Sequence, residues 1–339
     1  MQNRLCVGRK AGNWNGIDLI KLLMAVCVVA IHTEPLYGHS GVGYAVYTGV
    51  VHCAVPFFFL ASGFLLAVKC KTPYTAADNL PVFRAFAAKI LRMYLLWSAV
   101  YFPFAVFEAI TRRQSAARFA LDYILKFFLN GAHHNSWQLW YLLSTLYAVL
   151  FIALLSRLRV PFGVIFGAGC VLFVLGLWIE SLQAREDLSG ALLTISRLTG
   201  AARLNPFLFR GFFYFPLGML LARRLLCALV GTALFVLGVA GQCLTDGAFA
   251  QIVCVAASVG LFCFAQGIEL RANPIFPLLR RMSTSMYLTH MLVFTSLYWV
   301  IYREKTFGLP MFLGTTAICV LLSLAWEKIR RKRRGRETE

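Results

Sequence analysis

The stretch GIDLIKLLMAVCVVAIHTEP, residues 16–35, decides how the rest of the chain is interpreted. It has the length of a membrane-spanning helix, which takes about 20 mostly apolar residues. It nevertheless contains Asp18, Lys21 and His32. The eleven residues from Lys21 to His32 make about three helical turns, so both side chains lie on one face, roughly 16 Å apart along the axis. Asp18 lies one turn before Lys21 on the same stripe.

Ionisable side chains within a membrane are energetically expensive and usually face a bundle interior or a water-filled cavity. The stripe therefore indicates a polar path along this helix. The alternative is topological, with Asp18 and Lys21 in the inner headgroup layer and His32 in the outer one. This segment alone leaves both interpretations open.

The whole chain has the composition of an integral membrane protein. Of its 339 residues, 60% are hydrophobic and 14% are charged, whereas ordinary soluble domains have about 25% charged residues. The apolar segments predict an all-α integral membrane fold, with about ten transmembrane helices in one polytopic bundle. The net charge of +19 is spread over short loops, so positive-inside topology explains it and nucleic-acid binding is not expected.

The alternation of charged loops predicts that both termini are cytoplasmic. We expect an amphipathic surface helix on the outer side within residues 111–134. A late helix is predicted at 284–301, preceded by an inner loop that contains Arg280 and Arg281. The predicted regions are a cytoplasmic leader (1–15), a transmembrane domain (16–327) and a basic cytoplasmic tail (328–339).

The ten cysteines lie mainly within apolar runs, and no Cys/His set has the spacing of metal ligands. We therefore predict no disulfide, no metal and no permanently bound cofactor. The chain also lacks the G-x-x-x-x-G-K-[ST] and G-x-S-x-G motifs, so neither ATP-driven transport nor serine-hydrolase chemistry is supported.

Five sequence features occur in a specific order. Lys21 and His32 are followed by AVPFFFLASGF at 54–64, a basic pair at Lys89 and Arg92, LWYL at 139–142 and STSMYLTH at 283–290. In this order and spacing the set resembles the membrane acyltransferase-3 family, whose integral-membrane O-acyltransferases modify bacterial surface polysaccharides and peptidoglycan. The resemblance extends from Gly16 to about Trp326.

Two differences from the usual sequence of the family indicate which of its branches this chain resembles. Many members have Gly-Val-Asp where this chain has Ala54-Val55-Pro56, and many have His where this chain has Gln138. Both differences bring the chain nearer the branch that includes an enterobacterial-antigen O-acetyltransferase and the membrane half of the vancomycin-resistance serine racemases.

The resemblance implies that His32 is the catalytic base, and acyl transfer to a hydroxyl needs such a group. Lys21, Lys89 and Arg92 are predicted to bind the phosphates of a cytoplasmic acyl-CoA, because fixed cations suit a polyanion. The alternative for Lys89 and Arg92 is contact with inner headgroups. Tyr287 and His290 share a helical face and are expected toward the inner side, where they contact the donor or form hydrogen bonds in the core.

Four residues are candidates for contact with the acceptor. They are Glu34, His52, Trp140 and Tyr141. For Glu34 the alternative is a surface carboxylate, for His52 a packing role, and for Trp140 and Tyr141 an interfacial anchor. Ser62 and Gly63 are expected to permit close helix packing rather than to supply a nucleophile.

These observations predict a multi-pass protein of the bacterial inner membrane. It would transfer an acyl group from acyl-CoA, with acetyl-CoA as co-substrate, to a hydroxyl of an envelope glycan or lipid-linked saccharide. One alternative is a transporter of a small polar solute such as serine, and another is a non-catalytic membrane partner of a separate enzyme. Membrane lipid is the expected surrounding, and the oligomeric state is left open.

Overall fold

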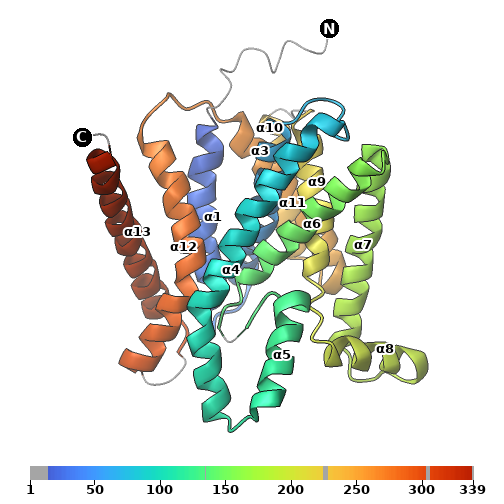
Figure 1. Cartoon of the computed structure of the whole chain (residues 1–339), viewed down its shortest axis with the longest axis vertical. Helices are drawn as coiled ribbons and strands as arrows, with labels where there is room; N and C mark the ends of the chain where they lie inside the picture. The colour runs from blue at the N-terminus through green and yellow to red at the C-terminus, as the bar shows by residue number, and fades with distance from the viewer. Residues whose placement is uncertain (1–13, 134, 224–227, 303–305, 338–339) are drawn as a thin grey trace.

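A computed structural model describes residues 14–133, 135–223, 228–302 and 306–337 (Figure 1). The described residues form helices and contain no strand, which confirms the all-α prediction. The elements are α1 (Asn15–Thr33), α2 (Val42–His52), α3 (Ala54–Ala67), η1 (Ala77–Asn79), α4 (Leu80–Thr111), α5 (Ala116–Leu129), α6 (Leu139–Arg157), α7 (Phe162–Gln183), α8 (Gly190–Ala201), α9 (Leu208–Leu221), α10 (Ala228–Gln242), α11 (Gly247–Gly267), α12 (Ile275–Leu297), η2 (Tyr298–Tyr302) and α13 (Leu309–Glu337).

Seven helical segments among the described residues are long and apolar enough to cross a membrane. They are α1, α2 with α3, η1 with α4, α6, α7, α11 and α13. Helices α9 and α10 have 14 and 15 residues, about 21–23 Å of helix, which is less than the roughly 30 Å of a hydrocarbon core. A multi-pass membrane protein follows, while the count of about ten spans stays a prediction.

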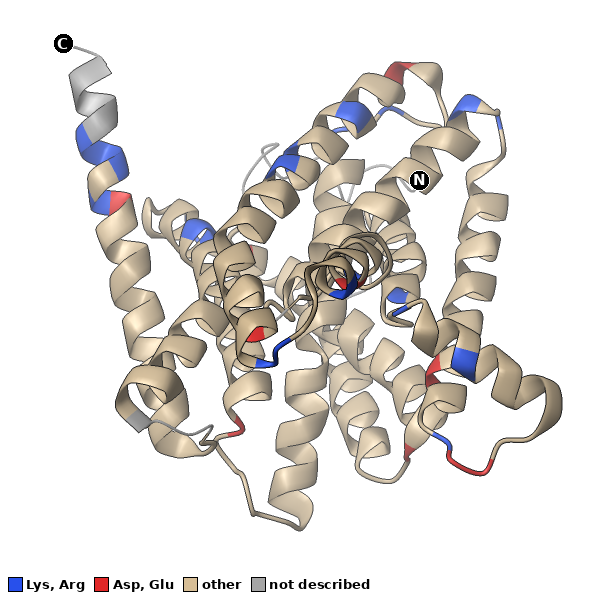
Figure 2. Cartoon of the chain, turned by 60° about the horizontal axis from the view of Figure 1, so that its bottom comes forward, with Lys and Arg blue, Asp and Glu red and all other residues tan. Residues whose placement is uncertain are grey.

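The start of α1 and the last turns of α13 lie at the same end of the bundle, at the top of Figure 1. Charged residues are sparse along the helices and are found mainly toward helix ends and loops (Figure 2). Both features suit a bundle whose middle lies in lipid. The cytoplasmic placement of the termini stays a prediction, and the expected leader lies almost entirely outside the described residues.

Two helices lie at the opposite end, α5 and α8 (Figure 1). Helix α5 falls within the predicted amphipathic segment, and no residue of α5 is buried. The Asp122 carboxylate on α5 pairs with Lys126 and with Arg203, each at 2.8 Å, and so ties α5 to the segment before α9. Helix α8 was not predicted, because its mixed-charge sequence gives a weaker apolar pattern than its neighbours.

The predicted start of α12 was wrong, and α13 extends into the residues of the predicted basic tail. Helix α12 begins at Ile275, directly after Pro274, and not at Thr284, because proline is tolerated at a helix start. Arg280 and Arg281 therefore lie within α12 and not in a loop. Helix α13 continues through residues 328–337, which were predicted as a separate tail, because Lys and Arg favour the C-terminal turns of a helix.

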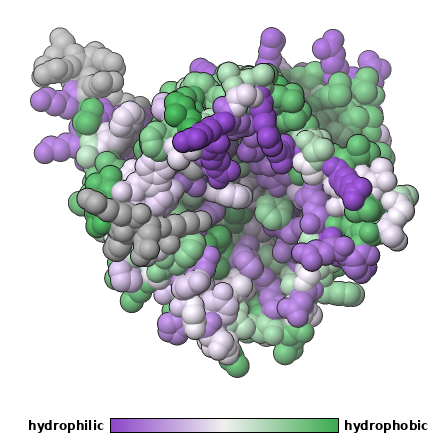
Figure 3. Space-filling view, turned by 90° about the horizontal axis from the view of Figure 1, so that it is seen from below, coloured by the Kyte–Doolittle hydropathy of each residue, from purple (hydrophilic) through white to green (hydrophobic). Residues whose placement is uncertain are grey.

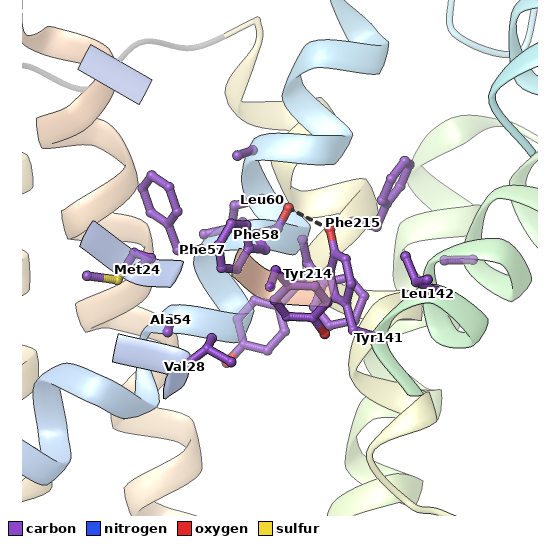
Figure 4. Packing of buried hydrophobic residues seen from close by; sticks show 14 of the residues in the cluster. Met24, Val28, Ala54, Phe57, Phe58, Leu60, Tyr141, Leu142, Tyr214 and Phe215 are labelled. Atoms are coloured by element: carbon purple, nitrogen blue, oxygen red, sulfur yellow. Dashed lines mark hydrogen bonds between the residues drawn. The ribbon is translucent and has the colours of Figure 1, made fainter. Parts of the chain in front are cut away.

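The centre of the bundle is a close crossing of α3 and α9. A Cβ atom built on Gly63 would collide with the carbonyl oxygen of Phe215, and one on Gly218 with that of Leu60. Figure 4 shows the buried aromatic rings that surround this crossing, Phe57 and Phe58 from α3 among them. The predicted packing role of Gly63 is confirmed.

We predict that Gly63→Ala destabilises the protein by about 1–3 kcal/mol, because the new methyl group forces two backbones apart. Gly167→Ala is the matched control: Gly167 is also helical, but a Cβ atom there meets nothing within 4 Å, so no loss is expected. Thermal unfolding of the purified variants measures both. Equal melting temperatures for the two variants would contradict this account of the crossing.

The loop between α5 and α6 contains a buried histidine, His133, which is 6% exposed. Its ring stacks on Tyr123, with centroids 4.1 Å apart. Neither ring nitrogen has a hydrogen-bond partner among the described residues. Burial lowers the pKa of His133 to about 4, and the nearby Lys126 lowers it further than Asp122 raises it.

This depressed pKa predicts a pH dependence of stability. The unfolded chain takes up the proton on His133 near pH 6.5, whereas the folded loop resists it until about pH 4. The contribution of His133 to the free energy of unfolding is therefore greatest above pH 6.5 and is lost as pH falls toward 4. In His133→Phe, which keeps an aromatic ring against Tyr123, the melting temperature should fall less over this range. An identical pH profile in wild type and variant would contradict the assignment.

Candidate functional site

The polar stripe of α1 ends in a pair of stacked imidazoles. The rings of His32 and His290 lie 5.2 Å apart between centroids, with their planes inclined by 30°. His290 is fully buried, whereas His32 is half-buried. His32 is therefore the more accessible member of the pair.

The surrounding helix fixes the ring of His290. Its Nδ1 lies 2.8 Å from the carbonyl oxygen of Tyr287 and 3.2 Å from that of Met286. Carbonyl oxygens only accept, so Nδ1 carries the proton and donates it. Nε2 then presents a lone pair, and it has no hydrogen-bond partner among the described residues.

The expected depth of His290 needs correction. It was predicted to lie toward the inner side, but it stacks on His32 at the outer end of the stripe. The reason is the earlier start of α12, which places His290 in the later half of that helix. A role of His290 in binding the donor stays a prediction, and the geometry now places it beside the proposed base.

A hydrogen-bond network supports this pair from α4 and α6. The Tyr101 hydroxyl donates to the carbonyl oxygen of Leu288 at 3.1 Å and accepts from Gln138 Nε2 at 2.7 Å. The Tyr287 hydroxyl donates to the carbonyl oxygen of Gln138 at 2.6 Å. Gln138, which stands where many relatives were expected to have His, therefore braces α12 at Tyr287 and Leu288. No motif in the sequence indicated that Tyr101 takes part in this network.

The inner end of the stripe gathers cationic side chains. Lys21 lies within electrostatic range of Lys89 on α4 and of Arg280 on α12. Asp18, which is 1% exposed, accepts two hydrogen bonds from Arg280, at 2.8 and 2.6 Å. Asp18 is thus the partner of Arg280, which takes both of its oxygens. Sequence reasoning missed Arg280 because it placed that residue in a loop.

Arg92 is exposed on α4, and its Nε donates to the carbonyl oxygen of Ala88 at 3.2 Å. It lies one turn after Lys89, which is also exposed. The structure brings Lys89 to Lys21, and it shows no direct contact of Arg92 with either lysine among the described residues. A role of all three cations in binding phosphate stays a prediction.

Of the acceptor candidates, Glu34 lies nearest in sequence to His32. It is an exposed residue in the left-handed conformation that ends α1, with φ of 44°, and its N–H donates to the carbonyl oxygen of Ala30. The helix therefore ends at Thr33, two residues before Pro35. Glu34 presents its carboxylate at the surface, as the alternative interpretation expected.

Trp140 and Tyr141 lie at the start of α6. The Tyr141 side chain is buried, and its hydroxyl lies 2.9 Å from Ser62 Oγ and donates to the carbonyl oxygen of Phe58 at 3.2 Å. Trp140 is half-buried against Phe59. These contacts give both residues a packing role, and their contact with a substrate stays a prediction.

His52 does not join His32. It lines a separate cavity with residues of α7, α10 and α11. On α2 it lies five residues after Tyr47, about 140° around the helix, and the Tyr47 hydroxyl is the group that reaches α1, donating to Ala30 O at 3.1 Å. His52, a candidate for contact with the acceptor, thus faces a cavity apart from His32, and its contact with an acceptor stays a prediction.

The face of the bundle opposite the chain termini is hollowed near its middle, with hydrophilic side chains in and around the hollow (Figure 3). The described residues contain no group of three or more His, Cys, Asp or Glu that could hold a metal ion. Along α1, the imidazole of His32 and the ammonium group of Lys21 lie at two depths, roughly 16 Å apart along the helix axis.

Comparisons with known proteins find partial matches to enterococcal racemases. An amino-acid racemase of Enterococcus faecalis is 29% identical over 175 residues, which are 51% of this chain and 22% of the relative. A serine/alanine racemase of Enterococcus gallinarum is 33% identical over 94 residues, 27% of this chain and 13% of the relative. The chain spans less than a quarter of the length of these relatives. No solved structure shows a significant match.

The family comparison covers far more of the chain. The family described as an acyltransferase domain matches residues 14–325, which include the stacked histidines, the inner lysines and the crossing of α3 and α9. The resemblance inferred from the five sequence features is confirmed, and the chain belongs to the acyltransferase-3 family of membrane proteins.

Proposed function

We propose that this protein is a membrane O-acyltransferase of the bacterial inner membrane. It takes an acyl group from cytoplasmic acyl-CoA, with acetyl-CoA as the donor, and transfers it to a hydroxyl of an envelope glycan or lipid-linked saccharide. One observation carries the proposal: α1 places an accessible imidazole at one depth and a lysine, within range of a second lysine, at another.

The inner lysines match the donor. An acyl-CoA carries several phosphates, and Lys21 and Lys89 provide fixed positive charge close together. Asp18 also lies within electrostatic range of Lys21, and both of its carboxylate oxygens accept hydrogen bonds from Arg280. The roughly 16 Å between Lys21 and His32 is a distance that an extended pantetheine arm spans, so the thioester reaches the imidazole.

The chemistry then needs a base, an acceptor and a leaving group. His32 takes the proton of the acceptor hydroxyl as its oxygen attacks the thioester carbonyl. The new ester C–O bond forms, the C–S bond breaks, and the proton passes to the departing CoA thiolate. His290 covers one face of the His32 ring and restricts its orientation, which is what a positioned base requires.

A second candidate function is transport of a small polar solute such as serine. The names of the enterococcal relatives favour keeping it, since one is a serine/alanine racemase. In that case the polar stripe of α1 would line a path for the solute, and His32 would bind it without chemistry.

Purified protein supplied with labelled acetyl-CoA and lipid-linked saccharide should transfer label to the saccharide. His32→Ala should lower the rate by about 10²–10⁴-fold, because it removes the general base. His39→Ala is the control, since His39 is an exposed loop residue whose Nδ1 contacts the carbonyl oxygen of Tyr37, and it should keep wild-type activity. Melting temperatures verify that each variant is folded.

The same preparation separates the two functions. Absence of both hydrolysis and transfer, together with serine uptake into vesicles that contain the protein, would overturn the transferase proposal. If His32→Ala transfers label at the wild-type rate, His32 is not the catalytic base, but the acyltransferase activity itself still stands.

Lys21→Met should raise the KM for acetyl-CoA by about 10–100-fold with little change in kcat, because a hydrogen bond to a charged phosphate is worth about 1.5–3 kcal/mol. Lys71→Met is the control on a loop: Lys71 is exposed and pairs with Asp78 at 2.8 Å, so its loss should leave KM unchanged. A fall in kcat with constant KM would instead show that Lys21 stabilises the transition state.

A further inference from the structure

A cavity of about 510 Å³ lies between α2, α7, α10 and α11. We name it the lateral pocket. Its polar lining comes from all four helices and from the turn between α10 and α11, and includes Thr48, His52, Glu180, Gln242, Asp246 and Gln251. Its volume is within the range of pockets that hold small organic ligands.

The lateral pocket is separate from the paired histidines. His32 and His290 are not among its lining residues. Helix α2 lies between the two sites, since its Tyr47 hydroxyl bonds to α1 while His52 faces the pocket. The two sites thus share α2 as a wall.

The charge of the lateral pocket selects against an anionic ligand. Its described lining residues include the carboxylates of Glu180 and Asp246 and no Lys or Arg. The negative charge of Glu180 is balanced by Arg210, whose Nη2 donates to both carboxylate oxygens at 3.0 and 3.3 Å. A phosphate or a uronic acid would find no free counter-charge there.

The remaining groups suit a ligand with many hydroxyls. The Gln251 amide, the Thr48 hydroxyl and the His52 imidazole can each accept or donate hydrogen bonds. Tyr44 and Leu177 add apolar surface to the same lining, against which the C–H face of a sugar ring packs. A few polar groups on an apolar wall fix the orientation of a small neutral ligand.

We propose that the lateral pocket binds a neutral sugar unit of the acceptor glycan, beside the unit whose hydroxyl is acylated at His32. The inference rests on the proposed function for the identity of the acceptor. Binding of a sugar to the pocket is a separate event from transfer, so each can fail alone.

The test measures binding of N,N′-diacetylchitobiose and of maltose to the purified protein by calorimetry, in a detergent without a sugar headgroup. Ala45→Trp fills the lateral pocket, because Ala45 lines it. Val46→Trp is the matched control, since Val46 is the next residue of α2, is 42% exposed and does not line the pocket. Hydrolysis of acetyl-CoA is measured on every variant.

We expect at least one neutral disaccharide to bind wild type and Val46→Trp equally, and to bind Ala45→Trp at least tenfold more weakly. Gln251→Ala, which removes only an amide, should weaken binding in the same direction if Ala45→Trp fails to fold. Hydrolysis of acetyl-CoA should persist in all of them.

Absence of binding to wild type, unchanged binding in both Ala45→Trp and Gln251→Ala, or preferred binding of glucuronate, serine or phospholipid would overturn the proposal. Acyl transfer without disaccharide binding would show that the lateral pocket is not a sugar site and would leave the proposed function standing. Disaccharide binding with neither hydrolysis nor transfer would refute the proposed function and leave the lateral pocket as a sugar site.

Discussion

The paired contact of Asp18 with Arg280 is the constraint on which the rest of the site depends. A carboxylate that is 1% exposed carries a large desolvation cost unless it is hydrogen-bonded to a cation. The two bonds from Arg280 meet that need and lock the inner half of α1 against α12. With this register fixed, the outer halves of the same two helices bring His32 onto His290.

The charged residues near Asp18 have different roles. Arg280 engages both oxygens of Asp18, while Lys21 and Lys89 lie within electrostatic range of each other and are the proposed partners of the donor. The backbone crossing of α3 and α9 supplies a rigid centre, and the network from Tyr101 through Gln138 braces α12 at the level of the histidines. The proposed donor and acceptor ends are therefore held by separate sets of contacts.

The sequence was informative where a pattern depends on one helix alone. The length and period of residues 16–35 predicted the stripe that joins Lys21 to His32, and the small side chain of Gly63 predicted close packing. It failed where the outcome depends on a partner far along the chain. Arg280 was assigned to a loop because the start of α12 has a weak apolar pattern, and that error also displaced His290. His52 was grouped with His32 because depth can be estimated from sequence, whereas the side of a helix that meets a neighbour cannot.

The central claim is that one helix connects an inner donor site to an outer base. The most direct measurement uses vesicles in which the protein has one known orientation, with labelled acetyl-CoA on the side of the inner lysines and the saccharide acceptor on the opposite side. The account predicts labelled acceptor when the two substrates lie on these opposite sides, and none when the donor is supplied only on the acceptor side. Transfer only when both substrates share one side of the membrane would contradict it.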